Sequence, residues 1–197
     1  MGIAIPQVIT PSKASGAQVI DGSLKFDGAS SQYLSKTFGS TGNRKTWTWS
    51  GWVKRTANNN GGLFGNYYSN DTFGTLFFNS DTLQLSANTT FFKTSQVLRD
   101  FSSFYHIVLA VDTTLAAAGD RVRLYINGSE VTSFATENNP SQNADLGLDN
   151  TTEIRIGRDG VNYYNGHLSQ VYHIDGQQLG PEYFGFTDPL TNTWKPK

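Results

Sequence analysis

Two short segments of the chain combine neighbouring tyrosines with asparagine and aspartate, a mixture suited to holding a sugar. They are residues 66–71 and residues 159–164. An aromatic ring can stack on a pyranose, while amide and carboxylate groups bond its hydroxyls. Consecutive residues of a strand point to opposite faces, so one tyrosine of each pair is expected in the core, and Tyr164 is the better core candidate of the second pair. The candidate carbohydrate-binding residues are Tyr67, Tyr68, Asn70, Asp71, Asn162 and Tyr163.

The chain offers little for catalysis. Retaining glycoside hydrolysis needs two carboxylates about 5 Å apart, yet no glutamate in the sequence has an acidic residue two positions away. A Gly-x-Ser-x-Gly nucleophile motif is also missing. The histidines, His106, His167 and His173, are not spaced as a metal-binding set. We therefore expect no enzymatic activity.

Short β-strands would have to position these residues. Alternation of apolar and polar residues runs through 104–112 and 121–128, and the second run is closed by an Asn-Gly turn typical of a hairpin. Similar runs recur at 23–28, 46–55, 63–65, 75–78, 82–85, 153–157 and 166–174. Many short strands with turn signals at intervals of about 8–12 residues predict an all-β protein, an antiparallel β-sandwich.

The run at 46–55 is rich in tryptophan and is expected to lie mostly in the core. Regular alternation places Trp47, Trp49 and Val53 on one face of this strand. Gly51 is a candidate for a bulge that would let Trp52 turn inward as well.

The composition fits one globular domain. With 37% hydrophobic and 13% aromatic residues, the 197-residue chain can build a core, which excludes global disorder. A net charge of −1 gives no support for binding to nucleic acid or to an anionic membrane surface. No segment approaches the roughly 20 apolar residues that span a bilayer. Cysteine is absent, which excludes disulfides and thiol chemistry.

The expected organisation has three parts. Residues 1–20 contain two prolines and short apolar pairs and are predicted to form an extended arm. Residues 21–190 form the sandwich domain, and residues 191–197 form a C-terminal tail. The first residues lack the basic region and long apolar run of a signal peptide, so we expect no secretion signal.

Five local patterns, in this order, resemble those of concanavalin A-like, laminin-G-like domains. They are Leu24-Lys25-Phe26-Asp27-Gly28, Trp47-Thr48-Trp49-Ser50-Gly51-Trp52-Val53, Tyr105-His106-Ile107-Val108, Leu124-Tyr125-Ile126-Asn127-Gly128 and Tyr164-Asn165-Gly166-His167-Leu168. The resemblance implies a concanavalin A-like jelly roll that binds glycans or other proteins. Endoglucanases of this kind usually carry Glu-x-Asp-x-x-Glu on one strand, and this sequence lacks that motif.

The same resemblance implies a calcium site. Many laminin-G-like domains bind one calcium ion at a rim of the sandwich through two aspartates and backbone carbonyls, and oxygen ligands suit this ion. Asp112 and Asp159 are the candidate ligands by their rough position, while Asp71 and Asp120 are equally acceptable by composition. The alternative is that these aspartates serve as turn residues.

Four further short sequence segments resemble those of domains in the virion proteins of tailed bacteriophages. In those proteins the domains belong to tail fibres, tail appendages or capsid surfaces. The segments are residues 42–48, 175–181, 184–188 and 194–197. This resemblance implies a place on the virion surface and attachment to capsid or tail proteins through residues 1–20. It leaves open whether the chain is a decoration subunit or a fibre module, and whether it forms a homo-oligomer.

The sequence therefore carries three functional hypotheses. The leading one is a non-enzymatic virion surface protein of a tailed phage, in contact with host glycans. The alternative is a free-standing, lectin-like carbohydrate-binding module whose site lies in the two tyrosine-containing loops. A glycoside hydrolase ranks below both, because the paired catalytic acids are missing.

Overall fold

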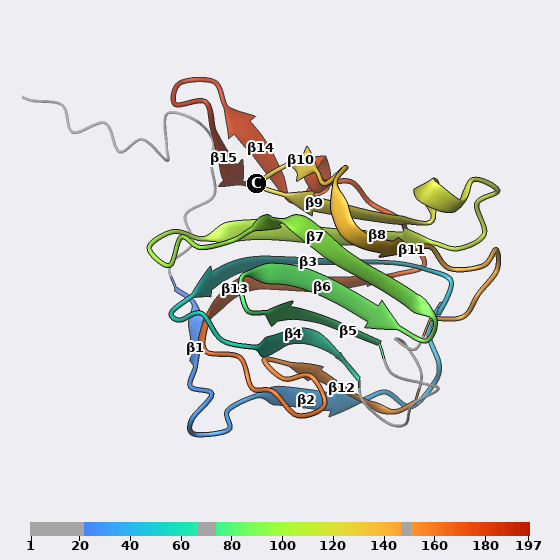
Figure 1. Cartoon of the computed structure of the whole chain (residues 1–197), viewed down its shortest axis with the longest axis horizontal. Helices are drawn as coiled ribbons and strands as arrows, with labels where there is room; N and C mark the ends of the chain where they lie inside the picture. The colour runs from blue at the N-terminus through green and yellow to red at the C-terminus, as the bar shows by residue number, and fades with distance from the viewer. Residues whose placement is uncertain (1–21, 67–73, 147–150) are drawn as a thin grey trace, which may run out of the picture.

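The predicted antiparallel β-sandwich is confirmed in the computed structural model, which describes residues 22–66, 74–146 and 151–197 (Figure 1). One sheet has the strand order β1 (Leu24–Phe26), β13 (Gly166–Asp175), β3 (Thr46–Arg55), β8 (Tyr105–Asp112), β9 (Val122–Ile126) and β10 (Ser129–Glu130). The second sheet has the order β11 (Phe134–Asn138), β7 (Thr90–Val97), β6 (Thr82–Ala87), β5 (Gly74–Asn79), β4 (Gly61–Asn66), β12 (Glu153–Ile156) and β2 (Leu34–Thr37). We call them the six-stranded and the seven-stranded sheet.

Strands that are distant in sequence lie side by side in both sheets. In the six-stranded sheet β3 lies between β8 and β13, and in the seven-stranded sheet β12 lies between β4 and β2. The predicted hairpin between β9 and β10 turns at Asn127 and Gly128, whose φ angles of 51° and 80° are those of a type I′ turn. The 3-10 helices η1 (Ala118–Asp120) and η2 (Pro181–Tyr183) are short. Within the described parts of the chain, no helix is long and apolar enough to cross a membrane.

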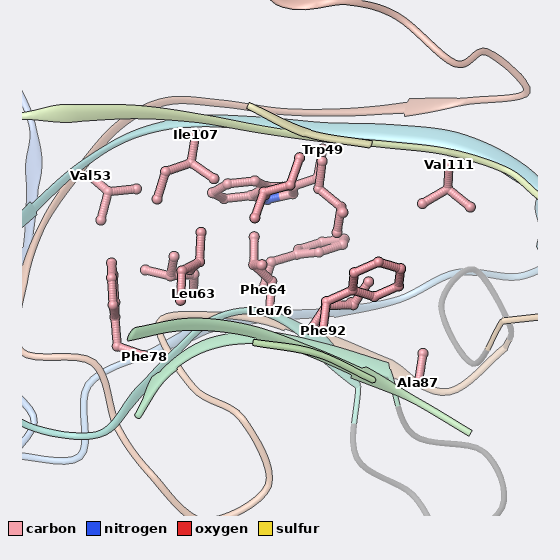
Figure 2. Close-up of a cluster of buried hydrophobic side chains, with 14 of the residues drawn as sticks. Trp49, Val53, Leu63, Phe64, Leu76, Phe78, Ala87, Phe92, Ile107 and Val111 are labelled. Carbon is pink, nitrogen blue, oxygen red and sulfur yellow. The ribbon is translucent and has the colours of Figure 1, made fainter. Parts of the chain in front are cut away.

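The core lies between the two sheets and follows from the alternation of each strand. Figure 2 shows Trp49, Val53 and Ile107 pointing from the six-stranded sheet toward Leu76 and Phe78 of the seven-stranded sheet. All five side chains are fully buried. Since each large apolar side chain contributes roughly 1.5–3 kcal/mol on burial, this layer is the main source of stability.

The expected bulge at Gly51 is wrong. β3 pairs with β8 without interruption from Thr46 to Val53. The register shift lies instead in β13, between Ser169 and Tyr172, where Gln170 has a φ of 45°. A Cβ on Gly51 would lie 2.8 Å from the indole of Trp49, so glycine leaves room for that ring.

Trp52 therefore points to the outer face of the six-stranded sheet, and it is buried there. Its ring lies 4.9 Å from that of His106, its partner across β8. The C-terminal segment, residues 177–197, covers this face. The ring of Trp194 stacks on His106, and Thr48 forms hydrogen bonds with Gln177 and Leu179. Both faces of β3 are thus buried.

The C-terminal residues form part of this covering layer. Residues 191–197 were expected to be a tail, but β15 (Thr193–Pro196) pairs with β14 (Gly185–Asp188) in a separate two-stranded sheet. An ion pair between Lys195 and the buried Asp188 links the two strands. Residues 1–20, predicted as an arm, lie outside the described residues.

His106 is held in its neutral form by the groups around it. Trp194 Nε1 can only donate, and it donates to His106 Nδ1 at 3.0 Å. The ring proton must then sit on Nε2, which lies 2.9 Å from the hydroxyl of Ser50. Burial lowers the pKa of His106 to about 4, well below its usual value.

We expect His106 to make the protein sensitive to acid. Because the neutral form is favoured in the folded state, its contribution to stability is complete above about pH 6.5 and is lost as the pH falls toward about 4. The lowering of the His106 pKa corresponds to about 3 kcal/mol of unfolding free energy. Denaturant unfolding of the wild type and of His106→Gln at pH 7 and pH 4 measures this loss. An equal loss in both proteins would contradict the assignment.

Candidate functional site

The structure describes one of the two tyrosine-containing loops. Tyr67, Tyr68, Asn70 and Asp71 lie outside the described residues. Asn162 and Tyr163 lie in the loop after β12, which we call the 157–164 loop. Tyr164 is buried and Tyr163 is partly exposed, as the alternation of the sequence predicted.

Asp159 organises the 157–164 loop. Its Oδ1 accepts hydrogen bonds from the backbone N–H groups of Val161 and Asn162, at 2.8 and 2.7 Å. The Asn162 side-chain amide donates to Oδ2 at 3.1 Å, and the backbone N–H of Asp159 donates to the carbonyl of Asn162. A bridge between Arg158 and Tyr163 closes the base of the loop. These bonds give the tip one conformation, because Asp replaces a missing backbone partner in such turns.

Two contacts fix the loop on the sandwich. Tyr164 is 2% exposed and its hydroxyl donates to the carbonyl of Lys54 at 2.8 Å, while burial raises the pKa of this phenol. The tip crosses β4 at Gly62, where an added Cβ would lie 1.9 Å from the backbone nitrogen of Asp159. The loop therefore forms a ridge on the outer face of the seven-stranded sheet.

The two candidate calcium ligands do not form one site. Asp112 lies at the Thr46 end of β3, whereas Asp159 lies near the Lys54 end of that strand, beside Tyr164. Ten residues of strand separate these ends by about 30 Å. Both carboxylates act as turn acceptors; Asp112 Oδ1 bonds the backbone and hydroxyl of Thr114. In the parts of the chain that the structure describes, no three His, Asp or Glu side chains gather in a way that could hold a metal.

A hollow of about 280 Å³ lies beside the ridge, on the outer face of the seven-stranded sheet. Its floor is made by Thr75 and Phe77 of β5 and Ser86 of β6, and its wall by residues 159–162. The ring of Phe77 is partly exposed. Val161, at the tip of the wall, is 74% exposed. The hollow thus combines an aromatic surface with hydroxyl and amide groups.

The sheet around the hollow continues this mixture. Phe77 pairs with Gln84, and Gln84 pairs in turn with Lys93 of β7. In the next row, Ser86 pairs with Phe91, a second partly exposed ring. The outer face of the six-stranded sheet offers no such surface at β3, because the C-terminal segment covers it there.

Phe77 was not predicted as a site residue. The doublet Phe77-Phe78 in a predicted strand carries the same signal as the tyrosine pairs, since only one of two consecutive rings can enter the core. The structure places Phe78 in the core and Phe77 outside. Asn162 was predicted as a carbohydrate-binding residue and Asp159 as a calcium ligand, and both line the hollow.

We predict that Gly62→Ala disrupts the ridge. The new Cβ would collide with backbone of the 157–164 loop, so we expect a loss of about 2 kcal/mol or more in unfolding free energy. Gly119→Ala is the matched control, because a Cβ there has nothing within 4 Å, and its effect should stay within about 0.5 kcal/mol. Denaturant unfolding of both variants measures the difference. Equal stability of the two variants would show that the loop does not press on β4.

Comparison with known proteins identifies the fold. A family model described as the concanavalin A-like lectin/glucanases superfamily matches residues 27–177. No curated protein matches the chain significantly.

Comparison with solved structures gives matches at low sequence identity. Domains LG4-5 of the mouse laminin alpha1 chain give a TM-score of 0.59 at 12% identity, covering 82% of this chain and 44% of that one. The SAP-like pentraxin of Limulus polyphemus gives 0.49 at 16% identity, over 72% and 68% of the two chains. The Ruminococcus gnavus sialidase CBM40 gives 0.48 at 16% identity, over 76% and 95%. This chain spans less than half of the laminin chain, and the likeness is one of fold. Since the family model covers most of the sandwich, the chain belongs to the concanavalin A-like lectin/glucanases superfamily.

Proposed function

We propose that this protein is a non-catalytic carbohydrate-binding domain whose ligand lies on the outer face of the seven-stranded sheet. The observation that carries the proposal is the partly exposed ring of Phe77, set between polar side chains and the rigid ridge. A sugar ring stacked on Phe77 would meet the hydroxyls of Thr75 and Ser86 and the amide of Asn162. Sugar binding needs this combination, because the ring faces are apolar while each hydroxyl needs a hydrogen-bonding partner.

The rigidity of the ridge supports the same function. A binding wall that is ordered before the ligand arrives saves the free energy of ordering it. The bonds from Val161 and Asn162 to Asp159, and the burial of Tyr164, give the wall this order. Val161 adds an exposed apolar group at the rim of the hollow.

The hollow is poorly equipped for hydrolysis. Asp159 is the one acid among the described residues that line it, and its oxygens already accept N–H groups of its own turn. Glycoside hydrolysis needs a pair of carboxylates on either side of the scissile bond. Binding without cleavage is therefore the function that this surface supports best.

We predict that Phe77→Ala weakens glycan binding tenfold or more, because the stacking surface is lost. A glycan array identifies a ligand, and calorimetry then measures its Kd for the wild type and the variant. Tyr183→Ala is the matched control, since this ring is 60% exposed but lies in η2 within the C-terminal segment. Unchanged affinity in Phe77→Ala, or an equal loss in both variants, would contradict the site.

The virion location is a further part of the proposal and rests on the sequence resemblance. The sequence segments at 42–48, 175–181, 184–188 and 194–197 resemble segments of tailed-phage virion proteins. In that setting the glycan face would point to the host, and attachment would fall to residues 1–20. Cryo-electron microscopy of particles from the source sample should show regular density for the sandwich on a capsid or tail. Purified particles without this chain would contradict the location.

A further inference from the structure

Arg158 differs from every other arginine of the chain in how its charge is satisfied. Five of them pair with carboxylates and one with backbone carbonyls: Arg44 with Asp145, Arg55 and Arg99 with Asp81, Arg123 with Asp120 and Glu130, Arg155 with Glu153, and Arg121 with the carbonyls of Leu115, Ala116 and Pro140. Within the described residues, Arg158 forms no ion pair. Its Nη2 donates one hydrogen bond to the carbonyl of Gly160 at 3.2 Å, and its shielded Nε has no hydrogen-bond partner.

Two tyrosines hold the Arg158 guanidinium in place. Its Cζ lies 4.6 Å from the ring centroid of Tyr163 and 5.1 Å from that of Tyr33. The two rings are 6.0 Å apart and inclined by 58°, so they form a cradle under the cation. Stacking on aromatic rings orients a guanidinium without using its N–H donors. Both N–H groups of Nη1 and one of Nη2 therefore remain available.

The carboxylates next to Arg158 are bonded to other groups. The Glu153 carboxylate accepts two hydrogen bonds from Arg155, at 2.9 and 2.7 Å, and these bonds, with a smaller attraction from Arg158, hold the pKa of Glu153 below its usual value. Asp159 accepts the N–H groups of its own turn. A cation that is oriented, partly exposed and in no direct ion pair with a described residue is suited to binding an anionic group from outside.

Arg158 lies on the same sheet face as the proposed sugar site, on the other side of the ridge. Tyr33 precedes β2 and Phe77 belongs to β5, and these strands are separated by β12 and β4. Three strand spacings correspond to about 14 Å. An oligosaccharide can span this distance across the ridge.

We propose that Arg158, in its cradle of Tyr33 and Tyr163, binds a carboxylate or sulfate group, and that the ligand of this domain is an acidic glycan. The sugar part of this inference rests on the proposed function, whereas the anion contact stands by itself. A planar guanidinium offers paired N–H donors that match the oxygens of either group.

Three sugars that differ at one carbon test the anion contact: glucose, glucuronic acid and glucose 6-sulfate. NMR titration of the amide signals of residues 158–163 should give about tenfold tighter binding for an acidic sugar than for glucose, as expected for a charge-assisted hydrogen bond. A preference for the carboxylate alone, the sulfate alone or both identifies the anion and supports the site. Equal binding of all three sugars would overturn it.

Matched variants separate Arg158 from general charge effects. Arg158→Gln should remove the preference for the acidic sugar, whereas Arg99→Gln, which makes the same change at a side chain 70% exposed, should keep it. Persistence of the preference in Arg158→Gln, or its loss in both variants, would overturn the proposal. Thermal unfolding of Arg158→Gln confirms that the loss is not one of folding.

The outcome also separates this inference from the proposed function. If the acid preference depends on Arg158 while Phe77→Ala leaves oligosaccharide binding unchanged, the anion site stands and the sugar-stacking site fails. If Phe77→Ala weakens oligosaccharide binding while acidic and neutral sugars bind alike, the sugar-stacking site stands and the anion site fails.

Discussion

Strand β3 is buried on both of its faces, and the rest of the molecule is arranged around this constraint. Its inward side chains, Trp47, Trp49 and Val53, fill the space between the sheets. Its outward side chains include Ser50 and Trp52, which are also buried, with exposures of 0% and 8%. A strand with two buried faces needs a layer on each side. The seven-stranded sheet supplies one layer and the C-terminal segment supplies the other.

This constraint decides which surface is free for a ligand. The outer face of the six-stranded sheet is used to bury Trp52 and His106 beneath Trp194. The outer face of the seven-stranded sheet is partly exposed at Phe77 and carries polar side chains in regular rows. The bonds of Trp194 and Ser50 to His106 therefore matter indirectly for the proposed function, because they hold the layer that leaves the other sheet as the proposed binding surface.

The 157–164 loop turns that flat sheet face into two distinct places. Asp159 fixes the conformation of the tip, Gly62 lets it lie against β4, and Tyr164 anchors its end in the core. On one side the loop walls the hollow at Phe77, and on the other it presents Arg158 above two tyrosine rings. The proposed sugar surface and the proposed anion-binding group can thus act on one ligand.

The sequence by itself determined the features that depend on neighbouring residues. Alternation with a period of two predicted most of the strands, although not β7, β11, β14 or β15, and with them the sandwich class. It also predicted that only one of Tyr163 and Tyr164 is buried, because the geometry of a strand assigns each side chain to a face. The Asn127-Gly128 hairpin followed for a similar reason, since both residues tolerate positive φ. The tertiary structure alone decided which strands pair, and with them the position of the bulge, the outward direction of Trp52, the separation of Asp112 from Asp159 and the approach of Tyr33 to Arg158. These contacts join residues far apart in the chain, and no local pattern specifies the partner of a strand.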